Sequence, residues 1–244
     1  MTNNNLGKDP SSFGEWLHEL SQTTQTWFLD EHQAREQALR TSREIVRNSA
    51  NSIRATHRGE FQTATHLLDE ITVLTKSIND ILEYHPRVYY AGFVEDAMKE
   101  YAEAAATLSF VRGHTPPSLE ELGIGAAPYL NGLAEAVGEL RRYSLDSLRQ
   151  DEFDRCERVL TVMDEVYSIL VTMDFPEAVT GGLRRRTDAA RGLLERTRGD
   201  ITLALRQHKL EKKLRSFKNH YQITNRFFNL SGRLSKNIAA KNNE

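Results

Sequence analysis

Residues 61–81 read FQTATHLLDEITVLTKSINDI, and this stretch decides the fold class. Its apolar residues recur every three or four positions, at Ala64, Leu67, Leu68, Ile71, Leu74, Ile78 and Ile81. Because an α-helix completes a turn in about 3.6 residues, this spacing places them all on one face of an amphipathic helix. The sequence contains no strand-like alternation of comparable length. We therefore expect an all-α protein.

The same spacing predicts further helices on both sides of this segment. Helical patterns cover residues 43–56, 87–111, 129–148, 153–173 and 176–210, and clusters rich in Gly, Pro or polar residues separate them. Ser118 and Glu121 match a capping box, which predicts one short extra helix. The chain is thus expected to form about six long helices plus short ones. Brief connections favour antiparallel packing of successive helices.

Charge is distributed unevenly along the 244 residues, although the formal net charge is only −2. Residues 206–244 hold ten Lys or Arg against two Glu, so the remainder of the chain is acidic. We expect a flexible N-terminus at 1–12, a helical domain at 13–211 and a basic C-terminal tail at 212–244. The tail also contains aromatic residues, and its composition fits either nucleic-acid binding or an unstructured solubilising end.

Several classes of protein are disfavoured by composition and motifs. The single cysteine, Cys156, excludes an intramolecular disulfide and is typical of a small buried residue. No leader pattern and no apolar run of about 18 residues occurs, so we expect a cytoplasmic protein that does not contact a membrane. A Gly-rich phosphate loop, an HExxH motif and a cysteine-containing metal motif are also lacking.

Residues 99–104 read KEYAEA and contain the first candidate site. On a helical wheel, Glu100 lies about 20° from the apolar residue Phe93, with Glu103 beside it. Glutamates three residues apart on a helix repel each other unless a cation lies between them. The nearest basic residue, Lys99, points about 100° away from Glu100 on this wheel. This acidic ridge without its own cation is a candidate metal site.

A second pair, Glu135 and Glu139, lies four residues apart on the next long helix. Both lie opposite the apolar stripe of that helix, so on their own they are typical of a solvated face with a Glu139–Arg142 pair. Two glutamates from each of two neighbouring helices also match the oxygen ligands that Mg²⁺ prefers. Such a site would catalyse attack of water on a phosphodiester. Both interpretations remain open from the residues alone.

The two acidic segments resemble the translin family, and in particular its catalytic branch, translin-associated factor X. The resemblance rests on KEYAEA at 99–104 followed by GLAEAVGELRR at 132–142. Residues 42–58 and 153–170 are similar to the helices that flank these motifs in the family. The similar region covers roughly residues 30–210.

This resemblance implies an all-α, translin-like fold of about seven helices that assembles into a hollow oligomeric shell, an octamer, around single-stranded nucleic acid. It implies Mg²⁺-dependent cleavage of single-stranded RNA, with Glu100, Glu103 and Glu139 matching catalytic, metal-binding glutamates. Glu135 stands where the catalytic subunit of animals has Asp. If this chain is the single family member in its organism, the shell is a homo-oligomer. The alternative is a non-catalytic binder of single-stranded RNA or DNA, as in the translin branch.

A shell that binds RNA also needs cations and aromatic rings facing the strand. The candidates on the first helix and ahead of the glutamates are Arg43, Arg47, Arg54, His57, Arg58, His85, Arg87 and Tyr90. Each of them alone also fits an ordinary surface or packing residue. The run Arg184–Arg186 is a denser charge cluster, but such runs usually keep the end of a helix solvated.

Overall fold

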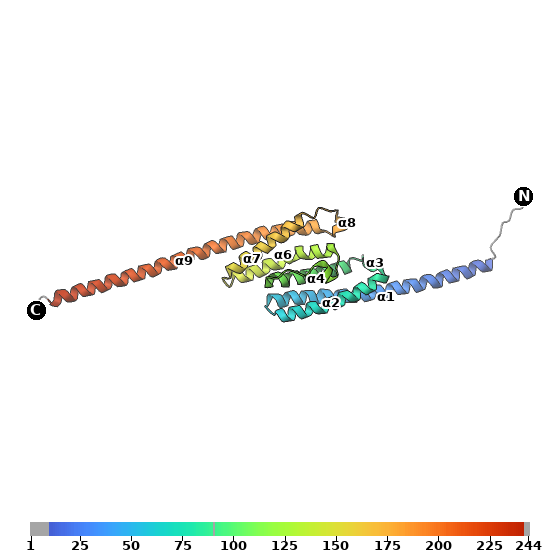
Figure 1. Cartoon of the computed structure of the whole chain (residues 1–244), viewed down its shortest axis with the longest axis horizontal. Helices are drawn as coiled ribbons and strands as arrows, with labels where there is room; N and C mark the ends of the chain where they lie inside the picture. Colours follow the sequence, from blue (N-terminus) through green and yellow to red (C-terminus); the bar gives the residue numbers. More distant parts are fainter. Residues whose placement is uncertain (1–9, 90, 242–244) are drawn as a thin grey trace.

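The computed structural model describes residues 10–89 and 91–241, with side chains described over 12–89 and 91–218. Within these ranges the chain is helical and contains no strand, which confirms the all-α prediction (Figure 1). The six long helices are α1 (Pro10–His57), α2 (Phe61–Tyr84), α4 (Phe93–Arg112), α6 (Ala126–Leu148), α7 (Phe153–Val171) and α9 (Leu183–Lys241). Three single-turn helices connect them, namely α3 (Pro86–Tyr89), α5 (Leu119–Leu122) and α8 (Glu177–Thr180).

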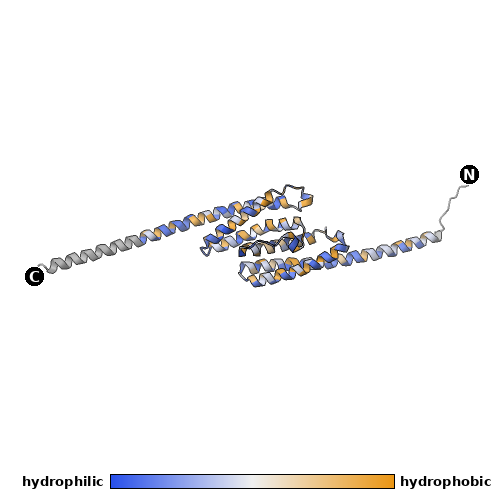
Figure 2. Ribbon diagram, viewed as in Figure 1, coloured by the Kyte–Doolittle hydropathy of each residue, from blue (hydrophilic) through white to orange (hydrophobic). Residues whose placement is uncertain are grey.

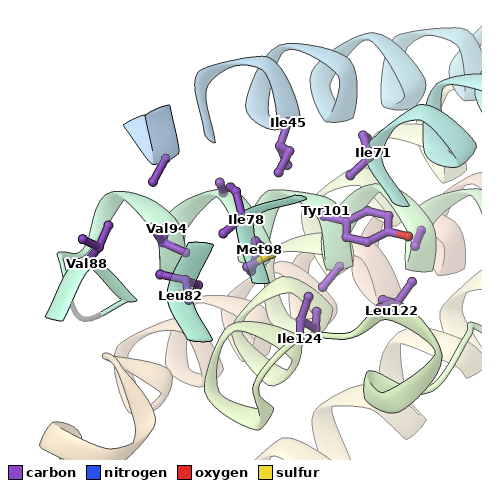
Figure 3. Packing of buried hydrophobic residues seen from close by; sticks show 14 residues of the cluster. Ile45, Ile71, Ile78, Leu82, Val88, Val94, Met98, Tyr101, Leu122 and Ile124 are labelled. Atoms are coloured by element: carbon purple, nitrogen blue, oxygen red, sulfur yellow. The ribbon is translucent and has the colours of Figure 1, made fainter. Parts of the chain in front are cut away.

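The long helices pack in sequence order, with α4 and α6 at the centre. α1 pairs with α2 and also contacts α4, while α7 and α9 both pack on α6. One core lies among α1, α2 and α4, where Ile45, Ile71, Ile78 and Tyr101 meet (Figure 3). A second core joins α6, α7 and α9 through residues that include Leu140 and Met163.

Half of the buried positions of the central helix α4 are alanine, so much of its surface carries only small side chains. Its buried alanines are Ala97, Ala102, Ala104, Ala105 and Ala106. A helix that contacts neighbours on several sides has little room for large side chains, and small residues let the adjacent backbones approach. The alanines therefore place α4 close to both α1 and α6.

Two of the predicted helices are each divided in the structure. The segment predicted at 87–111 forms α3 and α4, and Gly92 between them has φ 29°. The segment predicted at 176–210 begins as α8 and restarts as α9 after Gly181 and Gly182, with φ 60° and 84°. These left-handed conformations suit glycine and break a helix. The capping box of Ser118 and Glu121 is confirmed at the start of α5.

The first and last helices extend beyond the packed body at opposite ends of the molecule (Figure 1). α1 begins at Pro10, well before the periodic pattern at 43–56, because no Pro and few Gly interrupt this part of the chain. α9 continues without a break to Lys241. The helix bounds do not coincide with the domain division at residue 211, which stays a prediction. None of the described helices is long and apolar enough to cross a membrane.

Candidate active site

Three of the four predicted glutamates come together between α4 and α6. Glu100 and Glu103 on α4 and Glu135 on α6 each offer a carboxylate oxygen, and these oxygens lie within 4.8 Å of one another. All three residues are partly buried. The wheel alone would have left Glu135 on a solvated face, whereas the packing of α6 on α4 turns it toward Glu100 and Glu103.

The close approach of α4 and α6 depends on Gly132, which precedes Glu135 by one helical turn. A Cβ atom at Gly132 would lie 2.6 Å from the Lys99 backbone oxygen, 2.6 Å from the Ala102 Cβ and 2.8 Å from the Glu103 backbone nitrogen. Rotation of a side chain cannot relieve these clashes, because two of the three atoms belong to the backbone of α4. Glycine at this position therefore permits the distance at which the carboxylates meet.

Lys99 and Arg186 supply cations that the wheel did not place at the site. The Lys99 Nζ lies 2.8 Å from Glu135 and 3.3 Å from Glu100, and the Arg186 Nε lies 2.8 Å from Glu135. The expectation of an acidic ridge without its own lysine was wrong, because the flexible stem of a lysine carries its ammonium far from the direction of its Cβ. Burial works to raise the pKa of Glu135, but the hydrogen bonds from Lys99 and Arg186 lower it overall.

Glu103 is the member of the cluster whose ionised form is least favoured. Burial, followed by the negative charges of Glu100, Glu135 and Glu139, raises its pKa to about 8. This pKa reflects burial first and the three neighbouring carboxylates second, while Lys99 offsets only part of the rise. Three carboxylate donors without nitrogen or sulfur ligands fit a hard divalent cation such as Mg²⁺, Ca²⁺ or Mn²⁺. The residues present therefore fit a metal, and the glutamate cluster, defined as Glu100, Glu103 and Glu135, would hold it.

Glu139 lies one turn further along α6 and is held by His57 from the end of α1. The His57 Nε2 is 2.5 Å from the Glu139 Oε2, and the His57 side chain is only 4% exposed. This hydrogen bond is the main cause of a lowered pKa at Glu139. The other ring nitrogen, Nδ1, is buried without a hydrogen-bond partner. His57, which the sequence predicts as a nucleic-acid contact, is thus the hydrogen-bond partner of a predicted catalytic carboxylate, and its contact with nucleic acid stays a prediction.

The remaining predicted nucleic-acid residues are spread over α1 and the α2–α4 connection. Arg43 is exposed on α1. The others contact local partners, namely Arg47 with Glu44, Arg54 with Asn51, Arg58 with Glu60, His85 with Asp30 and Glu31, and Arg87 with the ring of Trp27. Tyr90 lies outside the described residues. Among the described members of the set, His57 alone is hydrogen bonded or ion paired to one of the four glutamates. Their role in RNA binding stays a prediction.

Comparison with known proteins agrees with this architecture. The model of the translin family matches residues 32–222. The chain belongs to the translin family. This translin-family chain is 31% identical over 191 residues to an uncharacterized protein of Methanocaldococcus jannaschii, an alignment that covers 78% of the chain and 84% of the relative. The resemblance drawn from the two glutamate motifs is therefore confirmed.

Solved structures of similar proteins share the fold. The translin-family chain is 35% identical to the protein in a structure described as an AfC3PO–duplex RNA complex, with a TM-score of 0.69 over 77% of this chain and 95% of that one. A crystal structure of AfC3PO matches at 35% identity and a TM-score of 0.68, over 77% of this chain and 96% of that one. Apo-NeC3PO, at 22% identity and a TM-score of 0.64 over 77% and 96%, shows the fold alone.

Three residues of the site were missed at the level of sequence. Lys99 was dismissed by its direction on the wheel, and Arg186 was interpreted as part of a solvated charge run. Gly132 did carry a signal, since a glycine inside a helical pattern often marks a close backbone approach. The distance in sequence between Arg186 and Glu135 explains why no local pattern could have paired them.

Proposed function

We propose that this chain is a Mg²⁺-dependent endoribonuclease that cleaves single-stranded RNA in the cytoplasm, inside a shell built from copies of itself. The observation that carries the proposal is the glutamate cluster, whose oxygens lie within 4.8 Å of one another between two packed helices. A bound divalent cation at such a site supplies an activated water and neutralises charge that develops on a phosphodiester.

The surrounding residues support this chemistry. Glu100, Glu103 and Glu135 would hold the cation, because their oxygens already converge and Glu103 lacks a full counter-charge. The hydrogen bond from His57 lowers the pKa of Glu139 and so favours its ionised form. The negative charge of Glu139 in turn raises the pKa of Glu103, so Glu139 extends the group of carboxylates toward α1. The Lys99 ammonium, which contacts both Glu135 and Glu100, would have to release them for these carboxylates to hold a cation.

RNA as the ligand is supported by the family and by the AfC3PO relative, whose structure is described as a complex with duplex RNA. Exposed cations on α1, such as Arg43 and Arg47, would neutralise phosphates. A specific observation favours the alternative of a non-catalytic nucleic-acid binder: Lys99 and Arg186 already neutralise Glu135 from within the protein.

Cleavage assays separate these two functions. Purified protein is incubated with labelled single-stranded RNA and, in parallel, with duplex RNA, in the presence of Mg²⁺ or EDTA. We expect cleavage of the single strand that requires Mg²⁺ and is lost in a Glu100→Gln/Glu103→Gln variant. Asp96→Asn, which removes an exposed carboxylate of the same helix, is the matched control and should remain active. Tight RNA binding without Mg²⁺-dependent cleavage would support the non-catalytic binder instead.

The shell is tested by the mass of the assembly. One chain weighs 27.9 kDa. An octamer requires light scattering from a chromatography peak to give eight times this value. A peak at the mass of one chain would contradict the shell, whatever the outcome of the cleavage assay.

A further inference from the structure

Two helical projections leave the body of the molecule at opposite ends (Figure 1). On α1 the ring of Trp27 contacts the body, where it lies 5.6 Å from the Arg87 guanidinium carbon. On α9 the ring of His208 contacts that of Phe153 of the body, at 4.6 Å between ring centroids. Beyond these two contacts, residues 10–26 of α1 extend by about 25 Å and residues 209–241 of α9 by about 50 Å, at about 1.5 Å per residue.

The projection of α1 carries an exposed apolar stripe. Phe13, Trp16, Leu17 and Leu20 form this N-terminal stripe, and their side chains are 43–55% exposed. The stripe continues through Trp27 onto the face that carries Ala34, Ala38 and Ile45, all of which are buried. The face of α1 that is buried inside the body thus continues beyond it with exposed side chains. Apolar residues recur along α1 in Figure 2.

The outer part of α9 carries a second stripe. Leu203, Leu210, Leu214 and Phe217 form this C-terminal stripe and are 58–74% exposed. On a helical wheel they fall within about 40° of Leu203, a spacing close to that of a coiled-coil seam. Like the N-terminal stripe, it has no covering helix among the described residues of this chain.

The two projections have opposite charge. Residues 10–33 contain four carboxylates and no Lys or Arg, whereas residues 206–218 contain six Lys or Arg and one Glu. Glu19 borders the N-terminal stripe, while Arg206, Lys213 and Lys218 border the C-terminal stripe. An acidic apolar helix is repelled by RNA phosphates and by anionic membranes, so the complement of the N-terminal stripe is a basic apolar surface.

We propose that the N-terminal stripe of one copy packs against the C-terminal stripe of a second copy as an antiparallel helix pair. The two stripes of one chain cannot meet, because they lie at opposite ends of the body (Figure 1). α1 and α9 run in the same direction along the long axis, so a two-fold rotation perpendicular to this axis brings each acidic projection beside the basic projection of the partner. Both ends are then paired, and the contact is closed.

Energy transfer between labelled copies tests this contact without using nuclease activity. One population carries a donor at Ser21→Cys and the other an acceptor at Ser216→Cys; both positions are exposed and lie off the stripes, and the natural Cys156 is buried. We expect transfer when the two populations are mixed. Absence of transfer would overturn the proposal.

Exchanging the charges separates this specific pairing from general association. Glu15→Lys/Glu19→Lys in both populations, or Lys213→Glu/Lys218→Glu in both, should weaken the association at least about tenfold, because each change removes the charge attraction between the two projections. Combining all four substitutions in every chain should restore transfer. Asp80→Lys/Glu83→Lys makes the same charge change at exposed positions of α2 and should have no effect. Failure of the combined variant to restore transfer would overturn the proposal.

Two further outcomes bear on what the stripes bind and on the size of the assembly. If added oligouridine abolishes transfer by binding to α9, the C-terminal stripe belongs to nucleic acid and the proposal is wrong. If transfer and its charge dependence persist while the mass corresponds to two copies, the pairing stands and the octameric shell is contradicted. The test therefore distinguishes failure of this contact from failure of the proposed nuclease.

Discussion

Gly132 on α6 lies against the backbone of Glu103 on α4, and the separation would be only 2.8 Å between a Cβ at Gly132 and the Glu103 nitrogen. The packing of α6 on α4 therefore determines the position of Glu103, the carboxyl group of the cluster whose pKa is raised most.

Replacing Gly132 with Ala should push α4 and α6 apart. We expect the free energy of unfolding to fall by about 1–3 kcal/mol, as in other overpacked cores, and the affinity for Mg²⁺ to fall as the carboxylates separate. Gly138→Ala is the matched control on the same helix, because its Cβ would meet only the Leu193 Cδ1 at 3.8 Å. That variant should be as stable as the original protein or more stable by up to about 1 kcal/mol. Urea denaturation and calorimetric titration measure both quantities; equal effects at the two glycines would contradict this account.

Removing the Lys99 ammonium should make the thermal stability of the protein depend more strongly on a bound metal. Lys99→Gln leaves Glu135 with Arg186 alone and leaves Glu100 without its partner, so the melting temperature without metal should fall. Mg²⁺ should then raise the melting temperature by more than it does in the original protein, because the competing cation is absent. Lys76→Gln, an exposed lysine of α2, serves as the control. A smaller response to Mg²⁺ in Lys99→Gln than in the original protein would refute competition.

The raised pKa of Glu103 predicts a specific dependence of stability on pH. The folded state holds this pKa at about 8, whereas an unfolded glutamate titrates near about 4.3. Between these values the folded state binds one more proton, so the contribution of Glu103 is fully present below about pH 4 and is lost as the pH rises to 8. Each pKa unit corresponds to at most about 1.4 kcal/mol.

The comparison with Glu103→Gln isolates this effect from all other groups. Without metal, the free energy of unfolding of the original protein should decrease relative to that of the variant between pH 5 and pH 8. Mg²⁺ should stabilise the original protein more at pH 8 than at pH 6, because the carboxyl group must lose its proton to bind a metal. Urea titrations at these pH values measure both differences. Parallel pH profiles for the two proteins would show that Glu103 keeps an ordinary pKa.

His57 should act through Glu139. His57→Ala removes the hydrogen bond to a half-buried carboxylate, so we expect a loss of about 1–3 kcal/mol in the free energy of unfolding and a higher pKa at Glu139. His57→Gln keeps a hydrogen-bond donor and should recover part of the loss. Carboxyl resonances in NMR titrations report the pKa directly. An unchanged pKa of Glu139 in His57→Ala would rule out this role.

Much of the fold followed from periodicity, because long amphipathic stripes such as the one from Ala64 to Ile78 have few alternatives to a helix. The glycine breaks at Gly92 and Gly181 were missed, since the apolar spacing continues across them. In the site, the family motif placed Glu135 with Glu100 where the wheel did not, because a wheel describes one helix and this site needs two. The contacts of Lys99 and Arg186 depend on long flexible side chains from separate helices, which no local pattern encodes.

The alanine-rich α4 also has a consequence for how this chain can change over time. Because the buried alanines of α4 leave no spare room, a methyl group added to one of them would push against a neighbouring helix, and one of the neighbouring helices carries Glu135. Substitutions at Ala102 or Ala105 are therefore constrained twice, because they would change the distances between the carboxylates as well as the stability of the fold. Variation is freer on the outer surfaces of α2 and α7, so divergence among relatives should accumulate there first.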